Sequence, residues 1–266
     1  MKSTWIRIFL VGTILFAFSD LVLQGTNNPN FFPTVIMLGA FVVPVTFVTY
    51  FYEHVRDRDI PLVVLGFCFV VGGTIGLIAA GFIEYDFISS ASVSGLLGVG
   101  LIEESAKLIL PLGLFIGWRY RHQADGLLFG VAVGMGFAAL ETMGYSLVSL
   151  IQSNGDITMM NDTLLVRGLL SPAGHGAWTG IVCAQLWAER QKAGHININV
   201  KVVGAFVLVV LLHATWDIVG SQNSNALAYG GMIAVGIISL AILIVEYRQA
   251  RKIPALPLAA ENVSTQ

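Results

Sequence analysis

Several charged and imidazole side chains lie inside long apolar stretches of this sequence. They are Glu103, Glu104, Lys107, Glu141, His175, His213 and Asp217. A charge near the centre of a bilayer costs roughly 2.5–3.5 kcal/mol even on lenient insertion scales, so we expect these side chains to meet one another or water. Carboxylates and imidazoles that meet can transfer protons, activate water or hold a metal ion.

Three of these residues fall within one helical turn. Lys107 follows Glu103 by four residues and Glu104 by three, so we expect it to partner one carboxylate while the other faces elsewhere. Adjacent carboxylates in a low-dielectric site resist sharing full ionisation. We therefore predict that Lys107 holds Glu103 and that Glu104 is the general base.

Two histidines share a His-x-x-Trp pattern, and His213 also precedes an aspartate by four residues. A neighbouring carboxylate can fix a histidine tautomer or support a metal ligand. Two mechanisms stay open: a glutamate of the acidic pair activates water while a histidine or Lys107 stabilises the oxyanion, or a metal ion, with zinc as the candidate, carries the attacking water. The candidate metal ligands are His175, His213 and Glu104; Glu103 and Glu141 complete the catalytic candidates, and Lys107, Asp217, Trp178 and Trp216 the supporting ones.

The composition places these residues in a membrane protein. The 266 residues are 56% hydrophobic and 11% charged, with mean hydropathy +0.79. These values exclude a soluble globule, a disordered or fibrous chain and a nucleic-acid-binding protein, because too few charges are present to solvate the chain or meet phosphates. Both cysteines, Cys68 and Cys183, fall in apolar runs, which excludes a disulfide framework.

Eight stretches approach the roughly 20 apolar residues that a membrane-spanning helix needs. We therefore predict an all-α, polytopic helical bundle forming a single domain over residues 1–266, with a catalytic core at about 92–220 and a cytoplasmic tail at 248–266. The predicted spans are Trp5–Leu23, Phe31–Tyr52, Leu62–Ile83, Ser92–Trp118, Gly126–Ile151, Leu164–Ala188, Lys201–Gly220 and Ala226–Tyr247.

Lysine and arginine residues gather at alternate ends of these spans. Because such residues are enriched on the cytoplasmic side, the pattern predicts that both termini are cytoplasmic, and Arg167 alone falls on the opposite side. Counted from the cytoplasmic ends, the acidic and histidine residues lie about 12 to 16 residues deep, roughly 18–24 Å at 1.5 Å per residue. We expect Glu103, Glu104, Glu141, His175 and His213 to converge on one water-accessible cavity.

Two further patterns concern how the spans pack and begin. Glycines at Gly126, Gly130 and Gly134, and at Gly72 and Gly76, repeat every four residues, which allows helix backbones to approach closely. Ser171 and Pro172 are typical of a helix start, so the sixth span has an alternative beginning one turn before His175, after a re-entrant segment.

At these motifs the chain resembles the PrsW family of bacterial intramembrane proteases, distant relatives of the CAAX prenyl endopeptidase (CPBP) group. The similar segments are Glu103–Lys107 (the family's EExxK element), Asp125–Gly130 running into Gly136–Glu141, His175–Gly180 and His213–Asp217, with 56–61 similar to an early cytoplasmic loop. Glu141 stands where the CAAX relatives' FxxxH element has histidine, so their metal site does not transfer directly.

The resemblance implies an intramembrane endopeptidase in the bacterial cytoplasmic membrane. Its partners would be membrane lipids and a membrane-anchored protein substrate, for some members an anti-sigma factor. Motifs of other intramembrane proteases, His-Glu-x-x-His, Gly-x-Gly-Asp and Gly-x-Ser-Gly, do not occur in the sequence. Three alternatives use the same residues: a secondary transporter or proton channel, a buried ionic network that only holds the bundle together, and a catalytically silent scaffold.

Overall fold

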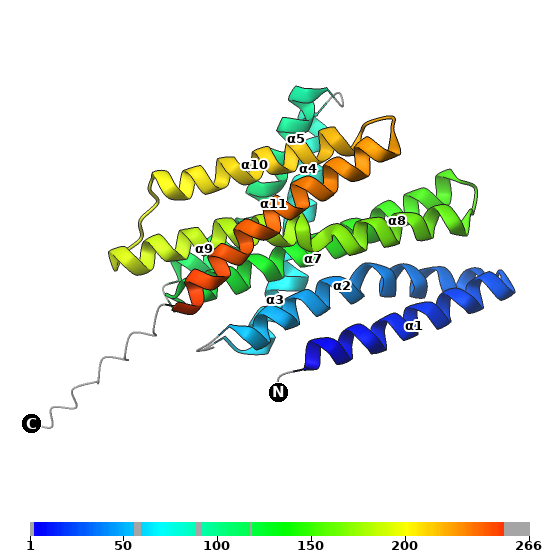
Figure 1. Cartoon of the computed structure of the whole chain (residues 1–266), viewed down its shortest axis with the longest axis horizontal. Coiled ribbons are helices and arrows are strands. Elements are labelled where there is room, and N and C mark those ends of the chain that lie inside the picture. Colours follow the sequence, from blue (N-terminus) through cyan, green and yellow to red (C-terminus); the bar gives the residue numbers. More distant parts are fainter. Residues whose placement is uncertain (1–2, 56–59, 89–91, 118, 253–266) are drawn as a thin grey trace, which may run out of the picture.

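The computed structural model describes residues 3–55, 60–88, 92–117 and 119–252, and these residues form an all-helical bundle without strands. Figure 1 shows the helices crossing one another in a layered bundle. The helices are α1 (Thr4–Thr26), α2 (Phe32–His54), α3 (Leu62–Phe67), α4 (Gly73–Phe87), α5 (Val93–Lys107), α6 (Ile109–Ile116), α7 (Gln123–Gln152), α8 (Ile157–Leu170), α9 (His175–Ala193), α10 (Val200–Gly220) and α11 (Asn225–Lys252). The short turns are η1 (Pro29–Phe31), η2 (Cys68–Gly72) and η3 (Ser171–Ala173).

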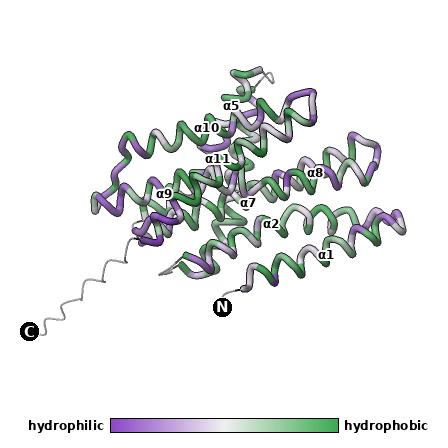
Figure 2. The backbone as a smooth tube through the Cα atoms, viewed as in Figure 1, coloured by the Kyte–Doolittle hydropathy of each residue, from purple (hydrophilic) through white to green (hydrophobic). Residues whose placement is uncertain are grey.

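Six of the eight predicted spans are long, apolar helices in the described part of the chain. They comprise α1, η1 with α2, the α3–η2–α4 unit, α7, α10 and α11. Figure 2 shows apolar residues along these helices and hydrophilic ones mainly at the turns. The chain is therefore a multi-pass membrane protein.

The other two predicted spans, Ser92–Trp118 and Leu164–Ala188, are wrong as continuous helices. The first is divided at Leu108 into α5 and α6, because Pro111 cannot donate a hydrogen bond to the carbonyl of Lys107. The second is divided by η3, as the pattern at Ser171 and Pro172 indicated. These two residues begin η3, however, and α9 begins at His175 with Gly174 as its N-cap, so the predicted helix start itself is wrong. Both interruptions place a helix end next to residues that the sequence marks as functional.

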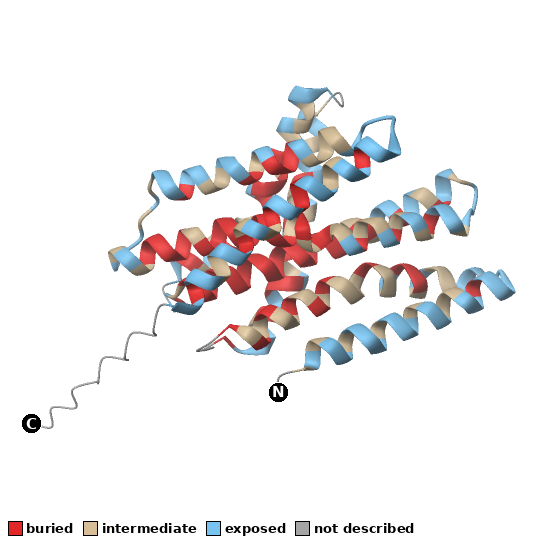
Figure 3. Ribbon diagram, viewed as in Figure 1, coloured by how far each residue is buried: buried red, intermediate tan, exposed pale blue. Residues whose placement is uncertain are grey.

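Helices α7 and α9 form the centre of the bundle, where buried residues concentrate (Figure 3). The predicted glycine contacts are confirmed here. A Cβ atom on Gly126, Gly130 or Gly134 would meet the carbonyl oxygen of Cys183, Thr179 or His175, respectively. Three successive turns of α7 thus lie directly against the backbone of α9, which fixes the position of His175 relative to α7.

Replacing Gly134 with alanine is expected to destabilise this contact, because the added methyl group collides with the backbone oxygen of His175. Overpacking of this kind costs typically about 1–3 kcal/mol. The thermal midpoint of the detergent-solubilised variant should fall. Gly204→Ala in α10 is the matched control, since nothing lies within 4 Å of its added Cβ; equal midpoints for the two variants would show that the α7–α9 contact is not tight.

The helix ends agree with the alternation of basic residues. Figure 1 shows the α1–α2, α7–α8 and α10–α11 turns at one end of the bundle, with the α9–α10 connection and the end of α11 toward the other. The cytoplasmic assignment of the second end stays a prediction. Residues 56–59, Trp118 and the 253–266 part of the predicted tail lie outside the described residues.

Candidate active site

The acidic pair and its lysine form a buried ionic cluster at the end of α5. Lys107 Nζ lies 2.9 Å from Glu103 Oε2, 2.8 Å from Glu104 Oε1 and 2.7 Å from Nδ1 of His175. The expectation that Lys107 partners only one carboxylate is therefore wrong. Residues three and four positions earlier both lie on its face of the helix, and its long side chain reaches between them. The ring of Phe137 lies 4.1 Å from the same ammonium group.

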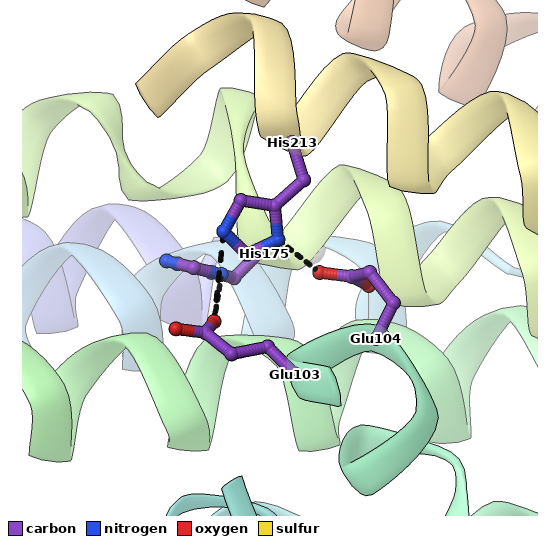
Figure 4. A group of neighbouring side chains, drawn as sticks. All are labelled: Glu103, Glu104, His175 and His213. Carbon is purple, nitrogen blue, oxygen red and sulfur yellow. Dashed lines mark hydrogen bonds and ion pairs between the residues drawn. The ribbon is translucent and has the colours of Figure 1, made fainter. Parts of the chain in front are cut away.

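His213, on α10, also reaches both carboxylates (Figure 4). Its Nδ1 lies 2.8 Å from Glu104 Oε1, and because a carboxylate only accepts, Nδ1 carries the proton. The other ring nitrogen, Nε2, lies 3.6 Å from Glu103 Oε2 and 3.5 Å from Asp217 Oδ2. These distances are too long for strong direct hydrogen bonds, so Nε2 remains available to water, a metal ion or substrate.

His175 is held by a second carboxylate. Its Nε2 donates to Glu141 Oε2 at 3.0 Å, so in the neutral ring Nδ1 is the acceptor that faces Lys107. Glu141 in turn accepts from Arg167 of α8 at 2.6 Å, and the Arg167 guanidinium lies 4.0 Å from the centre of the Tyr145 ring. The chain Arg167–Glu141–His175 therefore fixes the orientation of this imidazole.

A cavity of about 440 Å³ opens beside the cluster. Of the five residues expected to converge, Glu103, Glu141, His175 and His213 line it, as do the supporting residues Asp217, Trp178 and Trp216. Glu104 does not, because it lies behind the cluster and is 2% exposed.

Trp178 shapes the wall between the two histidines. Its ring stacks on His213 with centroids 4.6 Å apart and meets His175 edge-on at 5.3 Å. Its indole Nε1 donates to Ser239 of α11 at 2.9 Å, and Trp216 packs against it at 5.9 Å. The tryptophans of the two His-x-x-Trp patterns thus pack together in one aromatic wall of the cavity.

The donor atoms of this site fit a metal ion. One ligand atom from each of Glu103, Glu104, His175 and His213 lies within 4.8 Å of the others, and imidazole with carboxylate is a donor set that zinc uses. Carboxylates at and around the cluster also outnumber the cations Lys107 and Arg167. They are Glu84, Glu103, Glu104, Glu141 and Asp217. A divalent cation would offset this excess of negative charge.

Comparison with protein families agrees with this geometry. The family model for the PrsW family intramembrane metalloprotease matches residues 60–245, which contain every residue that lines the cavity. The chain belongs to the PrsW family. No curated protein and no solved structure gives a significant match to this PrsW chain. Family membership identifies it as a membrane-embedded peptidase.

Sequence reasoning missed two charged residues of the PrsW cavity. Arg167 stands inside a predicted span, yet it was used only to assign the orientation of the chain. Glu84 of α4 lies one residue beyond the predicted end of the third span and also lines the cavity. A search for every charge in or next to a span would have found both.

Proposed function

We propose that this protein hydrolyses a peptide bond of a membrane-anchored protein inside the cavity, with Glu103 as the general base. The observation that carries the proposal is that Glu103, whose carboxylate borders the cavity, lies beside two oriented histidines inside a membrane bundle. Such a site can hold a water molecule next to a peptide bond while keeping lipid away.

The geometry favours Glu103 over Glu104 for activating water. Glu103 borders the cavity, and its Oε2 accepts one hydrogen bond from Lys107. Oε1 of Glu104 accepts from both Lys107 and His213, and this side chain has no surface on the cavity. The base predicted from spacing alone was Glu104, so we now propose the reverse division: Glu104 positions His213 and Lys107, and Glu103 takes the proton of water.

The other steps fall to the remaining cavity groups. When Glu103 accepts a proton, the hydroxyl adds to the carbonyl carbon and negative charge develops on the carbonyl oxygen. The first turn of α9 begins at His175, and backbone N–H groups in a first turn have no intrahelical acceptor, so they can stabilise that oxygen. Glu103 then returns this proton to the departing amine, and the C–N bond breaks.

A metal ion is compatible with this scheme. His175, His213 and Glu104 would hold it, and it would supply Lewis acidity that polarises the scissile carbonyl and acidifies a water molecule. Zinc is the ion that we propose. In that case His175, His213 and Glu104 would act as ligands, and proton transfer would remain with Glu103.

The substrate proposed here is a single-span membrane protein, with anti-sigma factors as the first class to test. The proposed location is the bacterial cytoplasmic membrane. The distant relationship to the CAAX peptidases stays a prediction from motif order.

The test is cleavage in proteoliposomes that contain the purified protein and a panel of epitope-tagged, single-span bacterial membrane proteins. We expect time-dependent shorter products, loss of cleavage with 1,10-phenanthroline, recovery on adding Zn²⁺, and zinc in the purified protein by elemental analysis. Circular dichroism before and after chelation is the control for folding. An intact protein that cuts no member of the panel would contradict the proposal, and ion flux in the same vesicles would support the transporter alternative. Cleavage by metal-free protein would assign the reaction to the carboxylate alone.

A further inference from the structure

An apolar groove lies between α8 and α11, and we call it the seam. It is lined by Leu165, Val166, Leu169 and Leu170 of α8 and by Tyr229 and Ile233 of α11. Leu169 is 61% exposed and Ile233 is 51% exposed. In a membrane these side chains face lipid.

The seam is continuous with the catalytic cavity. Val166 and Leu170 line both, and Met232, next to Ile233, also lines the cavity. The outward-facing side chains of α8 therefore form the seam, while Arg167 of the same helix points to the cavity and binds Glu141. One helix separates lipid from the ionic cluster at this place.

The walls of the cavity are closed by helix packing elsewhere. In the described part of the chain, α4 packs on α5, α5 on α10, α10 on α11, α4 on α7 and α7 on α8. No comparable packing joins α8 directly to α11 in the described residues, and the two helices are linked through η3 and α7, which each contact both. Figure 1 shows the two helices diverging toward the end that carries the α7–α8 and α10–α11 turns.

We propose that the membrane-spanning helix of the substrate docks in this seam and passes its scissile segment between α8 and α11 into the cavity. This inference rests on the proposed function, because it names the route by which a membrane-anchored protein reaches that site. The lining carries no charge, so an apolar helix can occupy it without desolvating an ion. The polar cavity behind it offers water and hydrogen-bond partners to backbone groups that a helix exposes on unwinding.

Site-specific photo-cross-linking tests the seam. Benzoylphenylalanine is placed at Leu169 or Ile233 of the full chain, and at Met37 on the lipid-facing side of α2 as the matched control, since Met37 is 49% exposed and lies away from both cavity and seam. Each variant also carries Glu103→Gln to prevent turnover. The probes are the tagged single-span proteins used in the cleavage test, in the same proteoliposomes.

We expect cross-links from positions 169 and 233 to a tagged probe, and none from position 37. The docking proposal would be overturned if positions 169 and 233 cross-linked only to lipid or only to a second copy of this chain. Cross-links equal to those from position 37 would also overturn it. A seam-specific cross-link to probes that the wild type never cuts would support the seam and contradict the proposed function. Cleavage by the wild type without a seam-specific cross-link would support the proposed function and contradict docking in the seam.

A second experiment blocks the same route with bulky side chains. Leu169→Trp combined with Ile233→Trp should slow cleavage of the membrane-anchored protein, whereas Val207→Trp, on the exposed face of α10, should not. Neither seam residue lines the cavity. Unchanged cleavage by the seam variant at matched expression would overturn the proposal.

Discussion

Glu103→Gln is expected to lower the rate of substrate cleavage by about 10²–10⁴-fold, the range typical of general acid–base catalysis. The amide keeps the shape of the side chain and can still accept from Lys107, but it cannot take a proton from water. The variant should therefore remain inserted and folded. Cleavage per molecule, measured in proteoliposomes at matched protein content, checks this.

Glu104→Gln is the informative comparison because the two carboxylates are adjacent and share Lys107. We expect this variant to lose stability as well as activity, since Glu104 is the more deeply buried partner of both Lys107 and His213. Full loss of cleavage in Glu104→Gln with an unchanged thermal midpoint, alongside an active Glu103→Gln, would restore the original assignment of Glu104 as the base.

Lys107→Met is expected to destabilise the protein by about 3–5 kcal/mol, because removing one partner of a buried ion pair leaves uncompensated charge. Here the loss would affect two carboxylates at once, both within 3 Å of a fully buried ammonium group. The thermal midpoint in detergent and the amount of folded protein in membranes should both fall.

Lys192→Met provides the control for this substitution. Lys192 also pairs with a glutamate three residues earlier, Glu189, but its side chain is 55% exposed. Exposed pairs contribute about 0–1 kcal/mol, so little change is expected. A Lys107 variant as stable as the Lys192 variant would show that the carboxylates are not charged together in the native site.

The helical class and most spans could be predicted because hydropathy and length are local properties of the chain. The two failures arose where a helix is interrupted inside an apolar run. Pro111 indicated the first interruption, because it cannot donate a hydrogen bond to the carbonyl of Lys107. Ser171 and Pro172 indicated the second. Apolar composition alone does not distinguish a continuous span from two shorter helices.

The candidate site was predictable in its membership more than in its connections. Charge inside apolar spans and common depth correctly brought Glu103, Glu141, His175 and His213 to one cavity. The contact of Lys107 with both carboxylates depends on its side-chain conformation. The contact of Arg167 with Glu141 depends on how α8 packs against α7. Neither feature follows from residue spacing.

The central claim, hydrolysis at this buried cluster, is tested most directly by mass spectrometry of the cleavage products formed in H₂¹⁸O. We predict a cut within the membrane-spanning segment of the substrate and ¹⁸O in the newly formed carboxyl group of the amino-terminal product, with both signals absent in Glu103→Gln. Products cut only outside the membrane segment, or products of equal yield from Glu103→Gln, would contradict the account.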